Sequence, residues 1–303
     1  MHTTEPAAIP APGPVRCLWP AQAQLGEGLC WSPASQSLWW VDILGHTLHR
    51  CDAAGGDRRS WTLPDTVSAV AERESAPGLV VSLRRGLALF DPARGSCTVL
   101  ASPEPDRPDN RFNDGKCDAR GRFWGGSMDF AARAPTGQLW CFEGSRARCA
   151  LSAGYPVTNG PTWIDGGRTL LFNDTVNRRV LAHDFDPAAG TVGPGRLWYE
   201  FPSDDGHPDG MTTDAAGRVW IAHWGAACVT AHDPRDAREL ARIDLPTRNI
   251  TNVAFGGADL STLFISSASS ELDAEQRAAE PLAGALFAVD AGAVGLAPHR
   301  FRG

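Results

Sequence analysis

Three oxygen-bearing side chains stand in short, glycine-containing segments that lie far apart in the chain. Glu27 is flanked by two glycines, Asn159 precedes a Gly-Pro pair, and Asp209 lies in the run Pro-Asp-Gly-Met. Each segment alone is typical of a turn between strands. Brought together, two carboxylates and an amide carbonyl form a hard-oxygen set suited to Ca²⁺, Mg²⁺, Mn²⁺ or a similar divalent ion. The sequence therefore contains a candidate oxygen-rich metal site.

The distance from each of these residues to the next apolar segment is nearly constant. The pairs are Glu27 and Leu38, 11 residues apart, Asn159 and Leu170, 11 apart, and Asp209 and Val219, 10 apart. Asn113 stands 10 residues before Phe123 in the same way, close to Arg111. Arg and Asn side chains can donate hydrogen bonds to the hydroxyls and carbonyl of a sugar-like ligand. The alternative is a structural ion pair between Arg111 and Asp114.

The elements that would position these residues form an internal repeat. A short apolar strand begins six times, at Leu38, Leu79, Phe123, Leu170, Val219 and Leu263, in steps of 41, 44, 47, 49 and 44 residues. A second, alternating strand follows each copy, and a tight Asp-to-Gly turn precedes some, as in 118–122 and 214–218. This period matches a four-stranded blade, and equivalent positions in a closed ring converge on its axis. The sequence predicts an all-β, six-bladed β-propeller with a central metal site, because a pair of β-sandwiches would not explain the spacing.

The repeats also set the predicted domain organisation. Residues 15–303 are expected to form a single propeller domain, with Val15–Trp19 as a strand that closes the ring beside the C-terminal strands. Residues 1–14, rich in Ala and Pro, are expected to be a disordered tail. The clearest helix candidate is the short stretch 270–279.

Composition argues against several classes of partner. With 28 Lys and Arg against 35 Asp and Glu, the net charge is −7, which disfavours a nucleic-acid partner. No stretch has the roughly 18 consecutive apolar residues of a membrane span, and the N-terminal residues do not look like a secretory signal. The eight cysteines lack metal-like spacing and are expected to be thiols in a reducing compartment. We expect a cytoplasmic protein without a membrane or nucleic-acid partner.

At these residues the sequence resembles the family of senescence marker protein, regucalcin and gluconolactonase. The resemblance runs from about residue 16 to the C-terminus and rests on five short motifs in order, at 25–28, 111–116, 158–161, 208–211 and 255–257. Members of this family are six-bladed propellers that open aldonolactones with a divalent metal in the channel. The resemblance implies that Glu27, Asn159 and Asp209 bind the metal, with Ca²⁺, Mg²⁺, Mn²⁺, Zn²⁺ and Fe²⁺ all open. It also implies that Arg111 and Asn113 contact the substrate.

The expected reaction is hydrolysis of a sugar lactone, such as L-arabinono-, D-xylono-, D-galactono- or D-gluconolactone, to the aldonic acid. The metal would polarise the ring carbonyl, and Asp209 would act as general base as well as ligand. Two alternatives remain: a non-catalytic propeller that binds Ca²⁺ or a partner protein, and a hydrolase of another ester or an organophosphate. The pairing of Arg111 with Asn113 favours a hydroxyl-rich ligand over an apolar ester.

One position departs from the family pattern. Some relatives carry a further substrate-contacting Glu in the loop after the third-blade strand, where this sequence has Asp129 and no Glu before Glu143. The preferred lactone therefore does not follow from the resemblance. The sequence also leaves open whether Asp129 replaces that Glu, and it leaves open the native metal, the oligomeric state, and the roles of His207 and of the segment 267–282.

Overall fold

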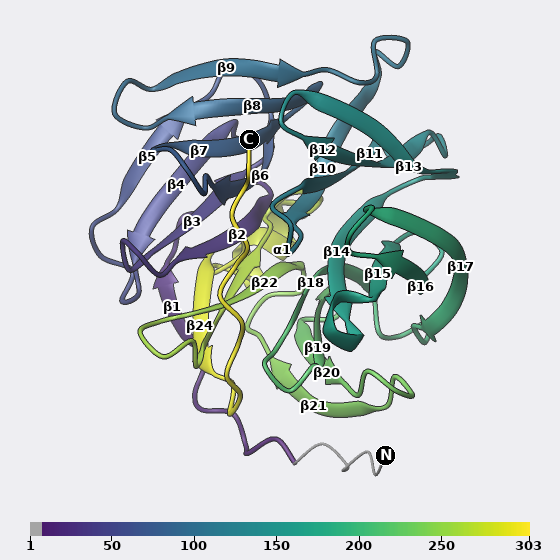
Figure 1. Cartoon of the computed structure of the whole chain (residues 1–303). Helices are drawn as coiled ribbons and strands as arrows, with labels where there is room; N and C mark the ends of the chain where they lie inside the picture. Colours follow the sequence, from purple (N-terminus) through teal and green to yellow (C-terminus); the bar gives the residue numbers. More distant parts are fainter. Residues whose placement is uncertain (1–7) are drawn as a thin grey trace.

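The computed structural model describes residues 8–303 and folds them into six four-stranded sheets around a central channel (Figure 1). The strands pair antiparallel, in chain order within each sheet, except where β1 joins the last sheet. The innermost strands of neighbouring sheets contact one another around the axis. The prediction of an all-β, six-bladed propeller is confirmed.

The blades are numbered in chain order, with their strands given from the channel outward. Blade one contains β2 (Gly26–Ser32), β3 (Ser37–Asp42), β4 (Thr47–Asp52) and β5 (Arg59–Thr62). Blade two contains β6 (Val67–Glu72), β7 (Leu79–Leu83), β8 (Gly86–Asp91) and β9 (Ser96–Ala101). Blade three contains β10 (Asn110–Cys117), β11 (Phe123–Asp129), β12 (Gly137–Glu143) and β13 (Arg146–Tyr155).

Blade four contains β14 (Thr158–Ile164), β15 (Thr169–Asp174), β16 (Arg179–Asp186) and β17 (Thr191–Glu200), with a 3₁₀ turn, η1 (Asp165–Gly167), after β14. Blade five contains β18 (His207–Thr213), β19 (Val219–Trp224), β20 (Cys228–His232) and β21 (Glu239–Asp244). Blade six contains β22 (Ile250–Gly256), β23 (Thr262–Ser267), β24 (Leu286–Asp290) and β1 (Arg16–Trp19), with α1 (Ala274–Ala279) between β23 and β24. The repeated apolar segments are the second strand of each blade.

The ring closes by joining the two ends of the chain in blade six. Strand β1 pairs with β24, with Arg16 opposite Ala288, so the predicted closing strand is confirmed. Ahead of it, residues 8–14 form no strand or helix, although the Gly13 N–H donates to the carbonyl oxygen of Asp290 at 2.8 Å. Residues 1–7 of the predicted tail lie outside the described residues. The tail and the domain boundary therefore stay predictions.

Apolar side chains fill the gaps between neighbouring blades. The described residues form six buried clusters, and each cluster lies between two adjacent blades. Between blades one and six, for example, Trp31 stacks on Phe264 with ring centroids 5.5 Å apart. A blade on its own cannot cover both of its faces, so the closed ring buries what single blades would expose. Packing between the blades leaves the channel as the place where polar side chains meet.

The Asp-to-Gly turn predicted before β11 is confirmed and also anchors the blade. The Asp118 Oδ1 accepts the N–H of Arg120 at 2.8 Å, and Gly121 has a φ of +78°, in the region that favours glycine. The other oxygen of Asp118 accepts bonds from the side chains of Arg122 and Trp124, at 2.7 and 2.8 Å. The turn before β19 repeats this arrangement.

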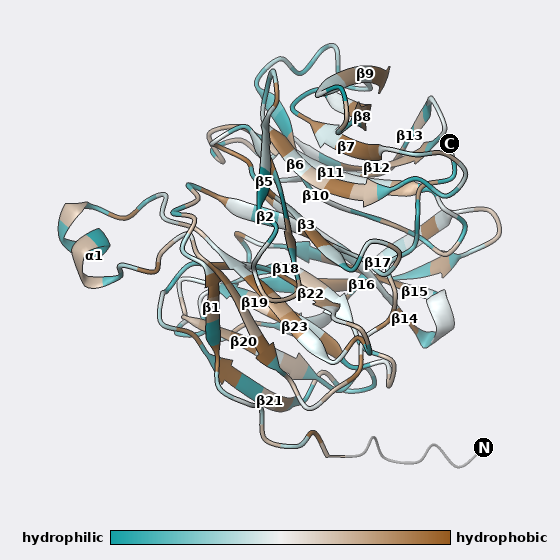
Figure 2. Cartoon of the chain, turned by 90° about the vertical axis from the view of Figure 1, so that its left-hand side faces the viewer, coloured by the Kyte–Doolittle hydropathy of each residue, from teal (hydrophilic) through white to brown (hydrophobic). Residues whose placement is uncertain are grey.

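The two ends of the channel carry different segments. The C-terminal segment after β24 crosses one face of the ring (Figure 1), where the buried Phe301 forms a bridge with Arg73. Helix α1 projects from the opposite face (Figure 2). It begins later than predicted, at Ala274, because Asp273 and Gln276 form a capping box. In the described part of the chain, no helix has the length and apolar character needed to cross a bilayer.

Candidate functional site

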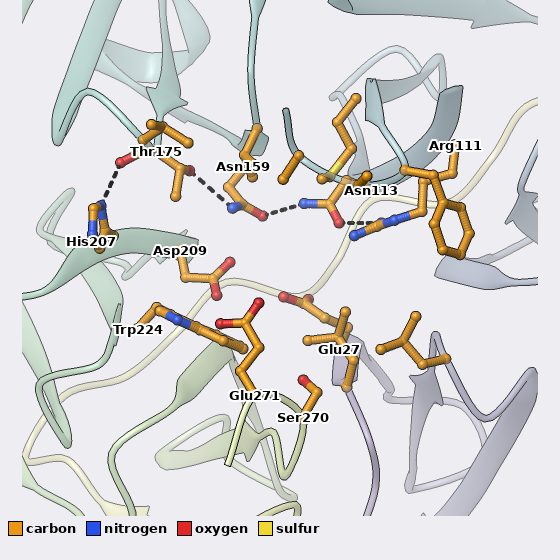
Figure 3. A pocket seen from close by; sticks show the side chains of 18 residues that line it. Glu27, Arg111, Asn113, Asn159, Thr175, His207, Asp209, Trp224, Ser270 and Glu271 are labelled. Carbon is orange, nitrogen blue, oxygen red and sulfur yellow. Dashed lines mark hydrogen bonds between the residues drawn. The ribbon is translucent and has the colours of Figure 1, made fainter. Parts of the chain in front are cut away.

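The five predicted site residues line one cavity at the α1 end of the channel (Figure 3). Glu27 lies in β2, Arg111 and Asn113 in β10, Asn159 in β14 and Asp209 in β18, so all five come from innermost strands. Each of these residues is only 2–6% exposed. The structure thus brings together the residues that the spacing singled out, while their roles stay predictions.

The expectation that these residues sit in turns between strands is wrong, because each lies inside a strand near a β-bulge. The register shifts are between Glu27 and Cys30, Phe112 and Gly115, Asn159 and Thr162, and Pro208 and Met211. A bulge inserts an extra residue, which bends the strand and re-aims its side chains. Gly28 and Gly160 take φ values of +59° and +79°, which glycine adopts at little cost. Residue types that usually form turns therefore form β-bulges here, within strands that continue on both sides of the bulge.

A chain of hydrogen bonds links the predicted substrate residues to a predicted metal ligand (Figure 3). Arg111 Nη1 donates to Asn113 Oδ1 at 2.6 Å, and Asn113 Nδ2 donates to Asn159 Oδ1 at 2.9 Å. Asn159 Nδ2 in turn donates to Thr175 Oγ1 at 3.0 Å. His207 Nδ1 contacts the Thr175 carbonyl oxygen at 3.1 Å. The chain therefore extends across blades three, four and five.

The donor-to-acceptor direction of this series of hydrogen bonds follows from Arg111, at its charged end. A guanidinium only donates, so Asn113 must present its oxygen to Arg111 and its amide nitrogen to Asn159. Asn159 then turns its oxygen toward the channel and its nitrogen toward Thr175. The Asn159 oxygen accepts one bond and keeps a second lone pair for a ligand. Asn113 also donates to the carbonyl of Thr158 at 2.7 Å, so both of its amide hydrogens are used.

The two carboxylates are held by neighbouring strands. Glu27 Oε2 accepts the N–H of Gly28 at 2.9 Å and the amide of Asn252, from β22, at 2.7 Å. The backbone carbonyl of Asp209 accepts a bond from Asn173 at 2.6 Å, which fixes the strand that presents the carboxylate. The carboxyl groups of Glu27 and Asp209 are close enough to interact directly.

Burial disfavours the charged forms of the acids in the channel, which outnumber the buried cations. Burial raises the pKa of Glu27 and of Asp209 well above the usual carboxyl range, and the Asp114 carboxylate raises both pKa values further. Burial also lowers the pKa of Arg111 to about 10 and lowers that of Lys116. When all five groups are ionised, the three buried acids Glu27, Asp114 and Asp209 exceed the two buried cations Arg111 and Lys116 by one negative charge. A cation in the channel would offset that excess.

The donor set at this point fits a divalent cation. Two carboxylates and the oriented Asn159 oxygen are the hard ligands that such ions prefer. Among residues 8–303, no three His, Cys, Asp or Glu side chains form a metal site by themselves. A cation here would therefore depend on the amide oxygen of Asn159 as well as on Glu27 and Asp209.

Several cavity residues were not found from the sequence. Thr175, Trp224, Ser270 and Glu271 line the same cavity as the predicted residues. Trp224 ends the second strand β19, and the other three follow the second strands β15 and β23. These strands return antiparallel to the end of the channel where the innermost strands begin. That topology is the signal that could have located them. The exposed Glu271 also has a φ of +64°, an uncommon conformation for a residue with a side chain.

Two residues whose roles the sequence left open now have defined surroundings. His207 lines the cavity and contacts Thr175, so it belongs to the site. Asp129 does not line the cavity, because its carboxylate accepts the N–H of Arg133 at 2.8 Å and closes its own loop. Asp129 therefore does not stand in for the glutamate that some relatives carry.

The fold and the site together define a propeller with a buried, oxygen-rich site in its channel. The chain belongs to the SMP-30/Gluconolactonase/LRE-like family, whose model matches residues 25–269. The resemblance noted in the sequence is confirmed.

Relatives match along nearly the whole chain. The 6-deoxy-6-sulfogluconolactonase of Pseudomonas putida is 34% identical over 95% of this chain and 99% of its own. The L-arabinolactonase of Azospirillum brasilense is 32% identical over 92% of each chain. A crystal structure titled as a calcium-binding protein, regucalcin, from Agrobacterium tumefaciens superposes with a TM-score of 0.91 at 30% identity, covering 96% of this chain and 98% of that one.

Proposed function

We propose that the protein hydrolyses a sugar lactone to the aldonic acid, using one divalent cation held by Glu27, Asn159 and Asp209. The observation that carries the proposal is the excess of buried carboxylate beside an oriented amide oxygen, in a cavity of about 350 Å³. Relatives named as lactonases at about a third identity support the reaction class. The regucalcin titled as calcium-binding supports a metal, and the donor set suits Ca²⁺, Mg²⁺ or Mn²⁺.

Arg111 is the residue best placed to hold the substrate. Its Nη1 bonds to Asn113 and to the carbonyl of Phe112, whereas its buried Nε has no hydrogen-bond partner. An unpartnered, buried donor is costly unless a ligand oxygen meets it. Asn113 has no free amide hydrogen, so it orients Arg111 and Asn159 and can accept a bond from a substrate hydroxyl through its oxygen.

Asp209 is the proposed general base. When bound, the cation would polarise the lactone carbonyl and lower the pKa of an attacking water. The water oxygen bonds to the carbonyl carbon and its proton passes to Asp209, and the ring C–O bond then breaks as Asp209 returns that proton to the leaving oxygen. Burial favours the protonated form of Asp209 and so raises its proton affinity.

The test is proton release from a panel of aldono-1,4- and 1,5-lactones, including the L-arabinono, D-xylono, D-galactono and D-glucono compounds. The protein is stripped with a chelator and resupplied with Ca²⁺, Mg²⁺, Mn²⁺, Zn²⁺ or Fe²⁺. We expect turnover to vanish on stripping and to return with one or more ions. Ca²⁺ binding without turnover of any lactone would favour the non-catalytic propeller, and turnover of organophosphates alone would favour the other hydrolase.

Asp209→Asn tests the base directly. We expect kcat to fall by about 10²- to 10⁴-fold, the usual contribution of a general base. Asp204→Asn is the matched control, because Asp204 is exposed and should leave kcat unchanged. Full metal affinity together with full turnover in Asp209→Asn would show that the assignment is wrong.

We also place this reaction in the cytoplasm. All eight cysteines are free thiols in the structure, which is typical of a reducing compartment.

A further inference from the structure

The mouth of the cavity has an apolar side and a polar side. Above the buried floor, the apolar side is formed by the end of strand β11 and by loops of blades three and four, through Met128, Phe130, Ala131, Ala132, Val157 and Val176. The opposite side is formed by blades five and six, through His207, Trp224, Ser270 and Glu271, and Leu25 and Leu44 of blade one also line the cavity. A ligand held at the floor would therefore meet different chemistry on its two sides.

The apolar side leaves large apolar side chains uncovered. In the described part of the chain, six large apolar residues are exposed, and the two that line this cavity are Phe130, at 40%, and Val176, at 45%. The Arg84 guanidinium carbon lies 5.1 Å from the centroid of the Phe130 ring, and the backbone N–H of Phe130 donates to the Asp109 carbonyl oxygen at 2.8 Å. Phe130 is thus held in place at the mouth. A ligand group that covers it and Val176 gains most if it is apolar.

The polar side is suited to hydroxyl groups. Figure 3 shows the Glu271 carboxylate directed toward Asp209 and Glu27 across the cavity. Its segment is fixed, because the backbone N–H groups of Ser269 and Ser270 donate to the carbonyls of Ala23 and Gln24. A carboxylate accepts hydrogen bonds from sugar hydroxyls.

The charges around the cavity further restrict the class of ligand that it can bind. Among the described residues that line the cavity, Arg111 is the one Lys or Arg side chain, and it lies at the floor. Arg84 and Arg111 both lie over the Phe130 ring, at 5.1 and 5.9 Å, but Arg84 does not line the cavity. Apart from Arg111, the apolar side of the mouth therefore has no lining cation for a sulfonate or phosphate at the far end of a substrate. Its one hydrogen-bonding side chain among the described lining residues is Thr175, whose hydroxyl already accepts a bond from Asn159.

We propose that the substrate is a deoxy sugar lactone. It would carry an apolar terminal carbon, such as a methyl group, against Phe130 and Val176, and turn its hydroxyls toward Glu271 and Arg111. This inference rests on the proposed lactone hydrolysis and narrows its substrate class. A terminal hydroxymethyl group would leave its hydroxyl against apolar side chains without a partner.

Matched pairs of 1,4-lactones that differ by one terminal oxygen test the proposal. The pairs are D-fucono- with D-galactonolactone, L-fucono- with L-galactonolactone, and L-rhamnono- with L-mannonolactone. In any pair that is hydrolysed, we expect kcat/KM to favour the deoxy member by roughly 10- to 100-fold, the range in which an apolar pocket rejects an added hydroxyl. Equal rates, or a preference for the hydroxymethyl member, would overturn the inference and leave lactone hydrolysis standing. No hydrolysis of any lactone would instead contradict the proposed function.

The variant Val176→Asn tests whether the side chains at the mouth cause the preference for deoxy lactones. We expect the deoxy to hydroxymethyl ratio to fall by at least threefold, with Phe130→Gln as the second variant should Val176→Asn unfold. Val99→Asn is the matched control, because Val99 is 64% exposed on β9 and does not line the cavity. A ratio unchanged in both mouth variants, or changed equally in the control, would show that these side chains do not select the substrate.

Discussion

Replacing Thr175 by Val should weaken metal binding without touching any proposed ligand. The Thr175 hydroxyl accepts the Asn159 Nδ2 hydrogen at 3.0 Å, and this bond keeps the Asn159 oxygen turned toward the channel. Valine has nearly the shape of threonine and lacks the hydroxyl. The backbone carbonyl that meets His207 is unchanged by the substitution.

The size of the effect follows from burial. Asn159 is 2% exposed and Thr175 is 8% exposed, so no bulk water replaces the lost acceptor. A buried donor left without a partner costs about 1–3 kcal/mol. If that cost falls mainly on the metal-bound state, where the amide cannot turn, the dissociation constant rises by about 5- to 150-fold. Outer residues that orient metal ligands contribute in this range, about 10- to 100-fold.

Competition with a fluorescent Ca²⁺ chelator, on stripped protein, measures the change. Thr175→Ser should keep nearly the wild-type affinity because it restores the hydroxyl. Thr162→Val removes a comparable buried hydroxyl pair, with Thr213 at 2.8 Å, and should lower stability while leaving Ca²⁺ affinity alone. The reasoning is refuted if Thr175→Val binds Ca²⁺ as tightly as wild type, or if Thr162→Val loses as much affinity.

Two further outcomes concern stability. Because the pKa values of Glu27 and Asp209 are raised, the folded, metal-free chain holds protons that the unfolded chain releases above pH of about 4, so its melting temperature should fall as pH rises from there. Metal binding must displace those protons, so Ca²⁺ should raise the melting temperature more at pH 8 than at pH 5, and an equal rise at both would contradict this. Phe301→Ala should lower the free energy of unfolding by about 3–5 kcal/mol in denaturant titrations, because Phe301 is fully buried. Leu296→Ala, at an exposed position, should change it by no more than about 0.5 kcal/mol.

The ring was predictable because its second strands are the most apolar and the most regular part of each repeat. The innermost strands were missed as strands, because β14 begins Thr-Asn-Gly-Pro and β18 begins His-Pro-Asp-Gly. Local propensity favours turns for such residues. In the ring, each innermost strand pairs with its own blade and contacts its neighbours, and that tertiary contact outweighs the propensity.

The site was predictable only where it follows the repeat. Glu27, Asn159 and Asp209 could be placed on the axis by counting from the repeated strand, without knowing that bulges present them. Thr175 and Glu271 follow the second strands β15 and β23, and the signal that locates them at the channel is the antiparallel return of those strands instead of a motif. The donor-to-acceptor direction of the hydrogen bonds through Asn113 could not be predicted either, because it depends on Arg111, which can only donate and lies beside Asn113 in the structure.

The bulges show how a repeated backbone can carry an unrepeated site. Register shifts occur in all six innermost strands, including β6 between Val67 and Ala69 and β22 between Ile250 and Asn252. The ring therefore offers an equivalent position in every blade, and the blades differ in what they place there. Blade two has the small Ser68, and blade six has Asn252, which binds Glu27 instead of the proposed cation. Two of the six equivalent positions hold acids, Glu27 and Asp209, and Asp114 lies one residue beyond the equivalent Asn113. Acids in all six blades would repel one another in the buried channel, whereas three carboxylates can be met by two cationic side chains and a bound cation.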